Sequence, residues 1–559
     1  MSKAHDSDLW WKNAVIYCLD VETYLDSNGD GIGDLPGLIE RIDYLAGMGI
    51  SCIWLMPFYP SANRDDGYDI TNYYAVDERL GTLGDFVVLI RAARDRGIRV
   101  IVDLVVNHTS DKHPWFKAAR SSRTSPFRDF YVWRDEPPKQ PAGDVVFPDA
   151  EDSIWAFDKK TEQYYLHHFY SHQPDLNIAN PAVREEIARI AGFWLELGVD
   201  GFRVDAVPFL LETRGIPDAP HLDPHLLLKE IRAFISRRKG EAMMLGEVNL
   251  PVQDLVSYFG EQPGDEIQLL FGFTVMQAAY LSFARCDAGP LRKALDALPP
   301  IPAEGQWANF LRNHDELTLD KLKDTEREEV FAAFGPDEDM QLFGRGLRRR
   351  LPPMFDGDQN RLRMAYSLMF SLPGTPVLFY GEEIGMGENL EIDGRLSVRT
   401  PMQWTDEASA GFSTARPARL RRPIPAGRYG PMAVNVEEQR RTDGSLLNWF
   451  ERLIRRRRET PELGDGAFEI IDVNDPAVLV HTVKGDNRTI ILLHNLSPEP
   501  REIRLRLRKE LAEGEIPLVD LLDGERGVLE LEGGVVDIRL DGFAHRWFAA
   551  QPPGAPRTP

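Results

Sequence analysis

Short apolar runs alternate with stretches of helical spacing along most of the chain. Eight runs have the near-continuous apolar character of buried parallel strands, and they cover residues 15–19, 52–56, 100–106, 201–205, 242–246, 269–273, 307–311 and 377–380. Helical spacing separates several of them, at 35–48, 86–96, 181–197 and 223–238. Eight strand–helix units are typical of a closed α/β barrel, so we predict a (β/α)8 TIM barrel rather than an open sheet.

Two parts of the chain break this alternation. Residues 107–175 are rich in His, Pro, Ser and aromatic side chains and too long for a simple loop, so we expect an inserted subdomain after the third strand. After a helix at 445–458 the pattern changes to short strands separated by turn residues, which predicts an all-β sandwich. The predicted domains are a barrel at 1–106 and 176–462, an inserted domain at 107–175, a sandwich at 463–550 and a disordered tail at 551–559.

The charge balance of the chain narrows the choice of ligands. Its 559 residues include 88 acidic and 65 basic side chains, a net charge of -23. Nucleic acids and anionic membranes select basic surfaces, so we expect neither as a partner. No apolar run approaches the roughly 20 residues of a membrane span, and residues 1–12 lack the apolar core of a signal peptide. A small neutral ligand fits this composition best.

The cysteines indicate the compartment. Cys18, Cys52 and Cys286 are odd in number and far apart, which favours free thiols and a reducing environment. We therefore expect a cytoplasmic protein. The sequence leaves its oligomeric state open, a homo-oligomer included.

Polar side chains follow four of the predicted strands. Asn107 and His108 end the third, Asp205 the fourth and Glu247 the fifth, and His314 and Asp315 follow the seventh. The carboxyl ends of barrel strands meet at one rim, where the chemistry of such folds lies. Each residue alone could be a cap, a turn or a surface charge, and for 200–206 a strand-capping ion pair is the alternative. Clustered carboxylates repel one another, so their convergence indicates a functional site.

Two carboxylates that face each other across a bond are the apparatus of glycoside hydrolysis. Arg203 shares a strand face with Asp205 and should keep it ionised at neutral pH, as a nucleophile requires. Glu247 has apolar neighbours that could raise its pKa toward the role of an acid. Asp315 is then free to bind sugar hydroxyls. Retention of configuration would require the two carboxyl groups about 5–5.5 Å apart.

Five motifs in order carry a family resemblance. They are DLVVNH at 103–108, QPDLN at 173–177, GFRVD at 201–205, LGEV at 245–248 and RNHD at 312–315. These resemble the ordered sequence regions of the α-amylase family, and the likeness runs from about residue 10 to the C-terminal domain. It implies a retaining α-glucoside enzyme on a (β/α)8 barrel with an inserted domain B and a β-sandwich domain C. By this resemblance Asp205 is the nucleophile, Glu247 the acid/base and Asp315 the transition-state stabiliser.

Within the family the chain is most similar to trehalose synthases, which interconvert maltose and trehalose. The similar stretches are HPWF at 113–116, SHQPDLN at 171–177, FLRNHDELTL at 310–319 and GRGLRRRL at 344–351. The segment GEVNLP at 246–251 is closer to α-glucosidases, and the start at 17–22 departs from the family pattern. The implied reaction is glucosyl transfer through a glucosyl-Asp205 intermediate, with side hydrolysis. The alternatives are an exo-acting α-glucosidase and, more distantly, an inactive family member that serves as a binding subunit.

The segment DDGYD at 65–69 resembles the family's loop after the second strand. By this resemblance Tyr68 stacks on the reacting sugar, and Asp65 pairs with Arg399 to hold the non-reducing end. Such a clamp excludes longer chains, which implies a disaccharide or short oligosaccharide as the substrate. An ordinary Asp-Gly turn is the alternative. The other sugar-binding residues that carry over are His108, Gln173, Arg203 and His314.

The segment DSNGDGIGD at 26–34 places oxygens at alternate positions, as at the start of a calcium loop. The closing glutamate is absent because Gly37 stands in its place, so the segment is not an EF-hand. The resemblance implies a structural Ca²⁺ or Mg²⁺ held by Asp26, Asn28, Asp30, the carbonyl of Ile32 and Asp34. A metal-free turn is the alternative.

A second structural ion is implied by the resemblance to trehalose synthases, and it would tie domain B to the barrel. Its ligands would be Asn107, Asp175, Glu212 and the carbonyls of Phe209 and Leu210. No organic cofactor is implied. The role of the arginines between 345 and 350 is left open.

Overall fold

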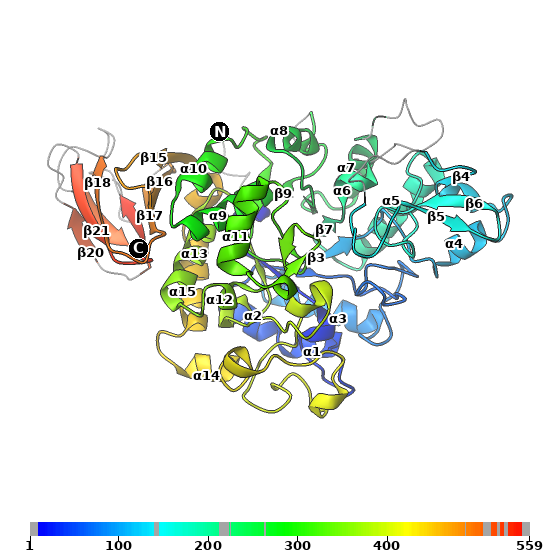
Figure 1. Cartoon of the computed structure of the whole chain (residues 1–559), viewed down its shortest axis with the longest axis horizontal. Coiled ribbons are helices and arrows are strands. Elements are labelled where there is room, and N and C mark those ends of the chain that lie inside the picture. The colour runs from blue at the N-terminus through cyan, green and yellow to red at the C-terminus, as the bar shows by residue number, and fades with distance from the viewer. Residues whose placement is uncertain are drawn as a thin grey trace.

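The protein has a barrel at its centre, an insertion on one side and a β-rich domain on the other (Figure 1). The computed structural model describes residues 9–138, 145–211, 223, 225–261, 264–486, 488–506, 516–522, 526–529 and 535–550. Eight parallel strands close in the order β1-β14-β10-β9-β8-β7-β3-β2. This confirms the fold class predicted from the alternating pattern.

The barrel strands are short and buried on both faces. They are β1 (Ile16–Leu19), β2 (Cys52–Leu55), β3 (Arg99–Leu104), β7 (Gly201–Val204), β8 (Met243–Gly246), β9 (Leu269–Phe271), β10 (Gln306–Asn309) and β14 (Thr375–Phe379). Their inner faces meet across the barrel and their outer faces are covered by helices, which explains why the sequence runs are continuously apolar.

The helices follow the predicted spacing with one exception. The stretch 35–48 forms two helices, α1 (Leu35–Glu40) and α2 (Ile42–Met48), because the backbone at Arg41 (φ -102°, ψ 5°) leaves the helical region. The amide of Arg41 donates to the carbonyls of Ile39 and Leu38, which tightens the last turn of α1 and ends it. The other helices are α3 (Leu83–Asp95), α4 (Pro114–Ala119), α5 (Pro181–Glu196), α6 (Val207–Leu210), α7 (Leu226–Arg238), α8 (Val252–Leu255), α9 (Phe273–Arg285), α10 (Gly289–Asp296), α11 (Asp324–Phe334), α12 (Leu351–Met354), α13 (Gln359–Ser371), α14 (Val436–Arg441), α15 (Leu446–Arg458) and α16 (Glu462–Asp465).

The insertion between β3 and α5 carries its own small sheet. Its strands are β4 (Trp133–Arg134), β5 (Trp155–Asp158) and β6 (Gln163–Leu166), in the order β4-β6-β5. The two ends of the insertion pair with each other: the amide of Leu176 donates to the carbonyl of Asn107 (2.8 Å) and that of Thr109 to Pro174 (3.1 Å). This pairing holds the insertion over the end of β3. A second small sheet of β11 (Leu317–Thr318), β12 (Gln341–Leu342) and β13 (Gly346–Leu347) follows β10.

The C-terminal domain consists of two antiparallel sheets. The larger has the order β15-β16-β17-β22-β19-β20 and the smaller pairs β18 with β21. Because side chains alternate along a strand, Val480 and Ile491 face the smaller sheet while Leu479 and Ile490 join the main core of the molecule. The strands are β15 (Ala467–Ile471), β16 (Val478–Lys484), β17 (Thr489–Asn495), β18 (Arg501–Arg506), β19 (Ile516–Asp520), β20 (Arg526–Leu529), β21 (Val535–Leu540) and β22 (His545–Ala550).

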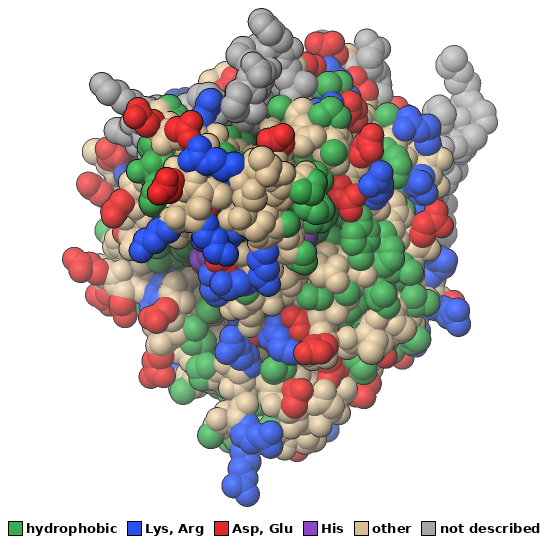
Figure 2. Space-filling model, turned by 90° about the vertical axis from the view of Figure 1, so that its right-hand side faces the viewer, with side chains coloured by type: hydrophobic (Ala, Val, Ile, Leu, Met, Phe, Trp, Pro, Cys, Tyr) green, Lys and Arg blue, Asp and Glu red, His purple; other side chains and the backbone are tan. Residues whose placement is uncertain are grey.

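On the face that the insertion presents, several basic side chains lie together left of the centre, and acidic and apolar side chains are scattered around them (Figure 2). Within the described part of the chain, none of the helices combines the length and apolar character that crossing a membrane requires.

Candidate active site

A cavity of about 510 Å³ lies at the carboxyl ends of the barrel strands. Asp205 directly follows β7 and Glu247 directly follows β8, while Asp315 lies between β10 and β11. All three line this cavity, and so do three of the predicted sugar-binding residues, Asp65, Tyr68 and His108. The parallel barrel thus brings together side chains that are far apart in the sequence.

A single guanidinium joins two of the three carboxylates. Arg203, which is 1% exposed, donates through Nη1 to Oδ1 of Asp205 and through Nη2 to Oε2 of Glu247 (2.6 Å). Its Nη1 also donates to Oδ1 of Asp103 (2.6 Å), and the Trp54 indole donates to the other oxygen of that carboxylate (2.8 Å). Because Asp205 and Glu247 contact neighbouring nitrogens of one planar group, their carboxylates lie close together.

The backbone next to Asp205 is strained. Ala206 has φ 49° and ψ 41°, in the left-handed region that non-glycine residues rarely adopt. In this conformation its amide donates to Oε2 of Glu247 (3.2 Å). Strain of this kind persists only where the surroundings impose it, and it is common at functional sites.

Burial raises the pKa of both carboxyl groups. Burial raises the pKa of Glu247 to about 7, and the charges of Asp205 and Asp315 add to the rise while Arg203 opposes it. Burial also raises the pKa of Asp205 to about 6, although Arg203 contacts it. Arg203 lowers the pKa of Asp205 in the direction expected, but burial and the nearby carboxylates of Asp103 and Asp315 outweigh it; a pKa of about 6 still leaves Asp205 mostly ionised at neutral pH. A raised pKa suits Glu247 to the role of an acid.

Asp315 lies among cations. Its Oδ1 accepts hydrogen bonds from Arg395 Nη1 (2.7 Å) and Arg399 Nη2 (3.0 Å), and its Oδ2 lies 3.2 Å from His314 Nε2. Burial alone would raise the pKa of Asp315, but His314, Arg395 and Arg399 more than offset it and the pKa is lowered. Burial lowers the pKa of His314 itself. Asp315 is therefore ionised.

In the predicted clamp at the non-reducing end, Asp65 pairs with Arg395 rather than with Arg399. Asp65 Oδ1 accepts from Arg395 Nη2 (2.6 Å), whereas Arg399 Nη1 donates to Asp66 Oδ2 (2.6 Å). The expected pairing of Asp65 with Arg399 was wrong, because Arg399 is directed at the neighbouring carboxylate. Sequence reasoning missed Arg395, although it lies four residues before Arg399 in the 3-10 turn η7 (Gly394–Val398). A search for a second arginine within one turn would have found it.

Four predicted sugar-binding residues lie outside the set that lines the cavity, and each contacts a residue within that set. Gln173 Nε2 donates to Oδ2 of Asp65 (2.9 Å), and His314 Nε2 lies 2.6 Å from the hydroxyl of Tyr68. The other two are Arg203 and Arg399, whose contacts are given above. Their direct contact with a sugar stays a prediction.

The insertion covers one side of the cavity. Arg345 Nη1 donates to the carbonyl of Val146 (2.8 Å), and the rings of Phe147 and Phe343 lie 5.0 Å apart. The guanidinium of Arg395 lies over the ring of Phe147, 5.0 Å from its centroid. This answers part of the question left open by the arginine-rich segment: Arg345 joins the insertion to the segment after β10. The other arginines of this segment bind groups of neighbouring loops: Arg348 and Arg350 donate to main-chain carbonyls, and Arg349 pairs with an acid.

The loop at 26–34 is held by its own amides. Oδ1 of Asp26 accepts from the amides of Asn28 (3.1 Å) and Gly29 (2.7 Å), and its Oδ2 accepts from Gly31 (2.7 Å). The remaining contacts join Asn28 Oδ1 to the amide of Asp30, Asp30 Oδ1 to the amide of Ile32, and Asp34 Oδ1 to the amide of Gly37. Gly31 has φ 97°, and a Cβ there would lie 2.3 Å from the carbonyl oxygen of Arg419, so the sharp turn requires glycine.

This donor set suits a hard cation, because each carboxylate has lone pairs beyond those that the amides occupy. Throughout the described ranges, however, no three His, Cys, Asp or Glu side chains are grouped so as to hold a metal ion. Binding would require Asp26, Asp30 and Asp34 to turn toward one centre, with Asn28 and the Ile32 carbonyl completing the set. The ion stays a prediction.

The second predicted ion has a less suitable setting. Asp175 accepts from Asn107 Nδ2 (3.3 Å) and from the amide of His168 (3.2 Å), and its second oxygen contacts Nδ1 of His168. Nitrogen groups, rather than further oxygens, thus surround this carboxylate. Phe209 lines the cavity and Leu210 ends α6, while Glu212 lies outside the described residues.

Comparisons with known proteins agree with this geometry. The catalytic-domain profile of the α-amylase family matches residues 20–331 and 348–466. The trehalose synthase/amylase TreS of Mycobacterium tuberculosis is 45% identical over 506 residues, which cover 89% of this chain and 84% of that protein. The trehalose synthase of a Pimelobacter species is 41% identical over 527 residues, which cover 92% of this chain and 91% of that protein.

A solved structure extends the likeness to the fold. The α-amylase from H. orenii superposes with a TM-score of 0.78 at 29% identity, and the match covers 97% of this chain and 100% of the other. Because the family profile covers most of the chain and the relatives match along nearly its whole length, this chain belongs to the α-amylase family of glycoside hydrolases and transglucosidases.

Proposed function

We propose that the chain interconverts maltose and trehalose by transferring a glucosyl group within the cavity at the carboxyl ends of the barrel strands. The observation that carries this proposal is the guanidinium of Arg203, which donates to Asp205 and Glu247 at once. Two carboxylates held this closely can act on the same glycosidic bond. The names of the two relatives, both trehalose synthases at 41–45% identity, support the choice of reaction.

In the first half of the reaction, an oxygen of Asp205 attacks the anomeric carbon of the non-reducing glucose. Glu247 gives its proton to the glycosidic oxygen, the bond to that oxygen breaks, and glucose is released beside a covalent glucosyl-Asp205 ester. The raised pKa of Glu247, about 7, keeps a proton available for this step near neutral pH. Ionised Asp315 accepts hydrogen bonds from sugar hydroxyls, and these strengthen as positive charge develops at the anomeric carbon.

In the second half, the released glucose turns within the cavity and presents its anomeric hydroxyl instead of its C4 hydroxyl. Glu247 takes the proton of that hydroxyl, the new C–O bond forms, and the bond to Asp205 breaks. The product is trehalose, with the configuration of the transferred glucose retained. Water in place of the glucose gives hydrolysis, and the printed name of the Mycobacterium relative includes amylase as well as trehalose synthase.

The cavity walls favour transfer over hydrolysis. We assign the pair of Asp65 and Arg395 to the end of the cavity that would hold the non-reducing glucose, and the lining residues Phe147 and Arg345 to the acceptor side. Walls of this kind slow the escape of glucose and the entry of water.

A cation bound at 26–34 would brace that loop, and every step above uses protein carboxylates alone. The three free thiols are the observation behind a proposed cytoplasmic location.

The test uses three sugars and one variant. The enzyme is incubated separately with maltose, trehalose and sucrose, and the products are separated by chromatography. We expect trehalose from maltose and maltose from trehalose, with little free glucose. Added ¹³C-labelled glucose should stay out of the new disaccharide if the released glucose remains trapped. Asp205→Asn should stop both reactions without unfolding the protein.

Two results would count against this assignment. Glucose formed from maltose with no new disaccharide would replace the isomerase with an exo-acting α-glucosidase. Turnover by Asp205→Asn at the wild-type rate would remove Asp205 from the mechanism. Both readings require the same residues, so the product pattern alone separates them.

A further inference from the structure

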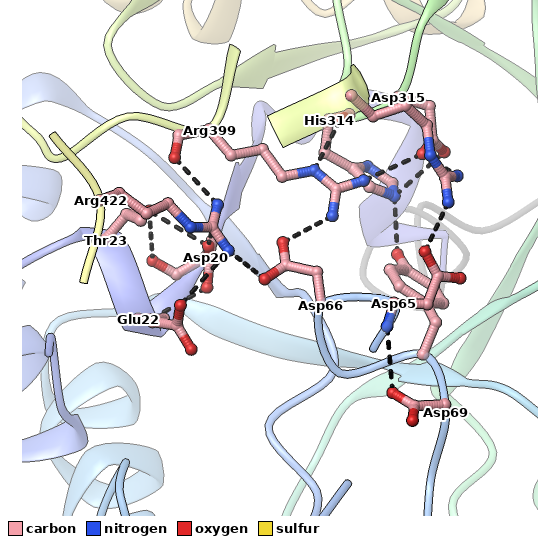
Figure 3. A network of polar contacts seen from close by, with 12 residues as sticks. Asp20, Glu22, Thr23, Asp65, Asp66, Asp69, His314, Asp315, Arg399 and Arg422 are labelled. Carbon is pink, nitrogen blue, oxygen red and sulfur yellow. Dashed lines mark hydrogen bonds and ion pairs between the residues drawn. The ribbon is translucent and has the colours of Figure 1, made fainter. Parts of the chain in front are cut away.

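Arg422 is a buried arginine that sequence reasoning did not single out. It is 6% exposed, and it lies outside the set of residues that lines the cavity. Figure 3 shows it at one end of a polar network whose other end is Asp315. A buried guanidinium is costly unless it is paired, so its partners indicate what it is there to do.

Arg422 contacts acids and a carbonyl from three separate segments. Its Nη2 donates to Oδ1 of Asp66 and lies 3.3 Å from Oε1 of Glu22. Its Nη1 donates to the main-chain carbonyl of Arg399 (2.9 Å) and lies 3.6 Å from Oδ2 of Asp20. The residue thus joins the segment after β1, the loop after β2 and the segment that carries Arg399.

Asp66 connects Arg422 to the cavity. One carboxylate oxygen accepts from Arg422 and the other from Arg399 Nη1 (2.6 Å). Arg399 in turn donates from Nε to the carbonyl of His314 (2.7 Å) and from Nη2 to Oδ1 of Asp315 (3.0 Å). The result is a continuous series of charged contacts from Arg422 through Asp66 and Arg399 to Asp315 (Figure 3).

Arg422 fixes Arg399 at both ends. It binds the main-chain carbonyl of Arg399 directly, and through Asp66 it fixes the direction of the guanidinium. Asp66 itself has φ 51°, so its own backbone is in a strained left-handed conformation that the surroundings must hold. Without Arg422, Oδ1 of Asp66 would lose its charged partner, and Asp66 could turn away from Arg399.

The cluster also needs the charge of Arg422. Asp20 and Glu22 follow β1, and both are buried beside Arg422. Burial would raise the pKa of Asp66, but Arg422 and then Arg399 overcome this and lower it to about 2. Two arginines therefore keep Asp66 ionised, and an ionised Asp66 is what holds Arg399.

We propose that Arg422 is a positioning residue for Asp315, acting through Asp66 and Arg399. This rests on the proposed function in one respect, the binding of the reacting sugar by Asp315. A purely structural arginine would instead lower stability while leaving the activity of each folded molecule unchanged. The two roles differ in the rate per folded molecule and in the pH profile.

The experiment compares Arg422→Met and Arg422→Lys with a matched control, Arg421→Met. Arg421 is the adjacent arginine, its side chain is 52% exposed, and it approaches the same Glu22 at 3.8 Å. With 4-nitrophenyl α-glucoside as substrate, release of nitrophenol reports glucosyl transfer whichever acceptor follows. We expect kcat/KM to fall about 10- to 100-fold in Arg422→Met, because small misplacements of a binding group cost rates of this order. Arg421→Met should stay within twofold of the wild type.

The pH profile gives a second readout. In the wild type the acid limb of kcat/KM follows Asp205, whose pKa is about 6, because the pKa of Asp66 is about 2. Loss of Arg422 should raise the pKa of Asp66, so a second protonation should steepen that limb and move it to higher pH. In Asp66→Asn that limb should not respond to Arg422→Met, and the double variant should lose little beyond either single variant. The charged and titratable groups that face this cluster are Asp20, Glu22, Arg79, Tyr380, Arg399 and Arg421.

Each result decides the proposal. Wild-type kcat/KM and an unmoved acid limb in folded Arg422→Met would overturn it, as would losses that simply multiply in the double variant. If Arg422→Met does not fold, Arg422→Lys decides, because lysine keeps the charge but cannot reach all of the acceptors. A loss of at least fivefold in kcat/KM then supports positioning, and wild-type kcat/KM overturns the proposal. A wild-type enzyme that leaves the nitrophenyl glucoside intact would instead overturn the proposed function.

Discussion

Replacement of Arg395 by methionine is the most direct test of how the cavity holds its substrate. Arg395 joins Asp65 (2.6 Å) to Asp315 (2.7 Å), and the side chains of all three are mostly buried. Hydrogen bonds to charged groups contribute about 1.5–3 kcal/mol each. Neither acid would be left without a partner, because Gln173 still donates to Asp65 and Arg399 to Asp315. The loss should therefore fall on binding geometry more than on folding.

The size of the effect follows from the contact with Asp315. Loss of one donor that orients a transition-state group costs about 3 kcal/mol, which corresponds to about 100-fold in kcat/KM. The contact with Asp65 should affect selectivity instead. Once that end of the cavity is no longer closed, maltotriose should improve as a substrate relative to maltose.

The assay measures kcat/KM for maltose and maltotriose with the wild type, Arg395→Met and Arg395→Lys. Lysine keeps the charge but can reach only one of the two carboxylates well, so it should fall between the other two. Thermal unfolding of each variant checks that the protein is intact. A folded Arg395→Met with kcat/KM within threefold of the wild type and the same ratio of the two sugars would refute the reasoning.

Three further predictions concern the acid, the C-terminal domain and the metal loop. Glu247→Gln should lose activity on maltose far more than on an aryl glucoside whose leaving group needs no proton, and equal losses on both would argue against its role as the acid. Burial lowers the pKa of His481 to about 4 and that of His494 well below its usual value. Below pH 6.5 the unfolded chain therefore binds more protons than the folded protein. The free energy of unfolding should fall between pH 6.5 and 4, by about 3 kcal/mol for His481. His481→Gln should flatten that dependence in pH-dependent thermal unfolding, and an unchanged slope would show that the ring does not carry it. Treatment with EDTA should lower the unfolding temperature of the wild type but not of Asp26→Asn if the loop binds an ion, and identical melting curves with EDTA and with added Ca²⁺ would favour the metal-free turn.

The barrel was predictable because its signal is local and repeated. Each strand is a short apolar run followed by helical spacing, and parallel strands must place their carboxyl ends at one rim. The sequence therefore predicts that Asp205, Glu247 and Asp315 share one rim, and all three line the same cavity. The pairing of Arg203 with Asp205 was equally local, because the two residues are two apart on one strand.

Features that depend on burial or on distant partners could not be predicted. The rise that burial causes in the pKa of Asp205 could not be predicted, because a sequence does not show how much water a carboxylate loses. The pairing of Arg399 was misassigned because two adjacent acids, Asp65 and Asp66, point to different arginines. Arg422 gave no signal at all, since its partner Asp66 lies more than 350 residues earlier in the chain.

Both faces of the larger C-terminal sheet are packed against other parts of the protein. One side is closed by β18 and β21, and the other lies on α13, where the indole of Trp547 donates to Ser367 (2.9 Å) and His494 lies 3.0 Å from the same hydroxyl. A shortened enzyme that stopped before β15 would expose the apolar side of a barrel helix to water, and we expect such a fragment to aggregate. Exchange of this domain with that of a relative would succeed only if the residues of α13 that contact it were exchanged as well.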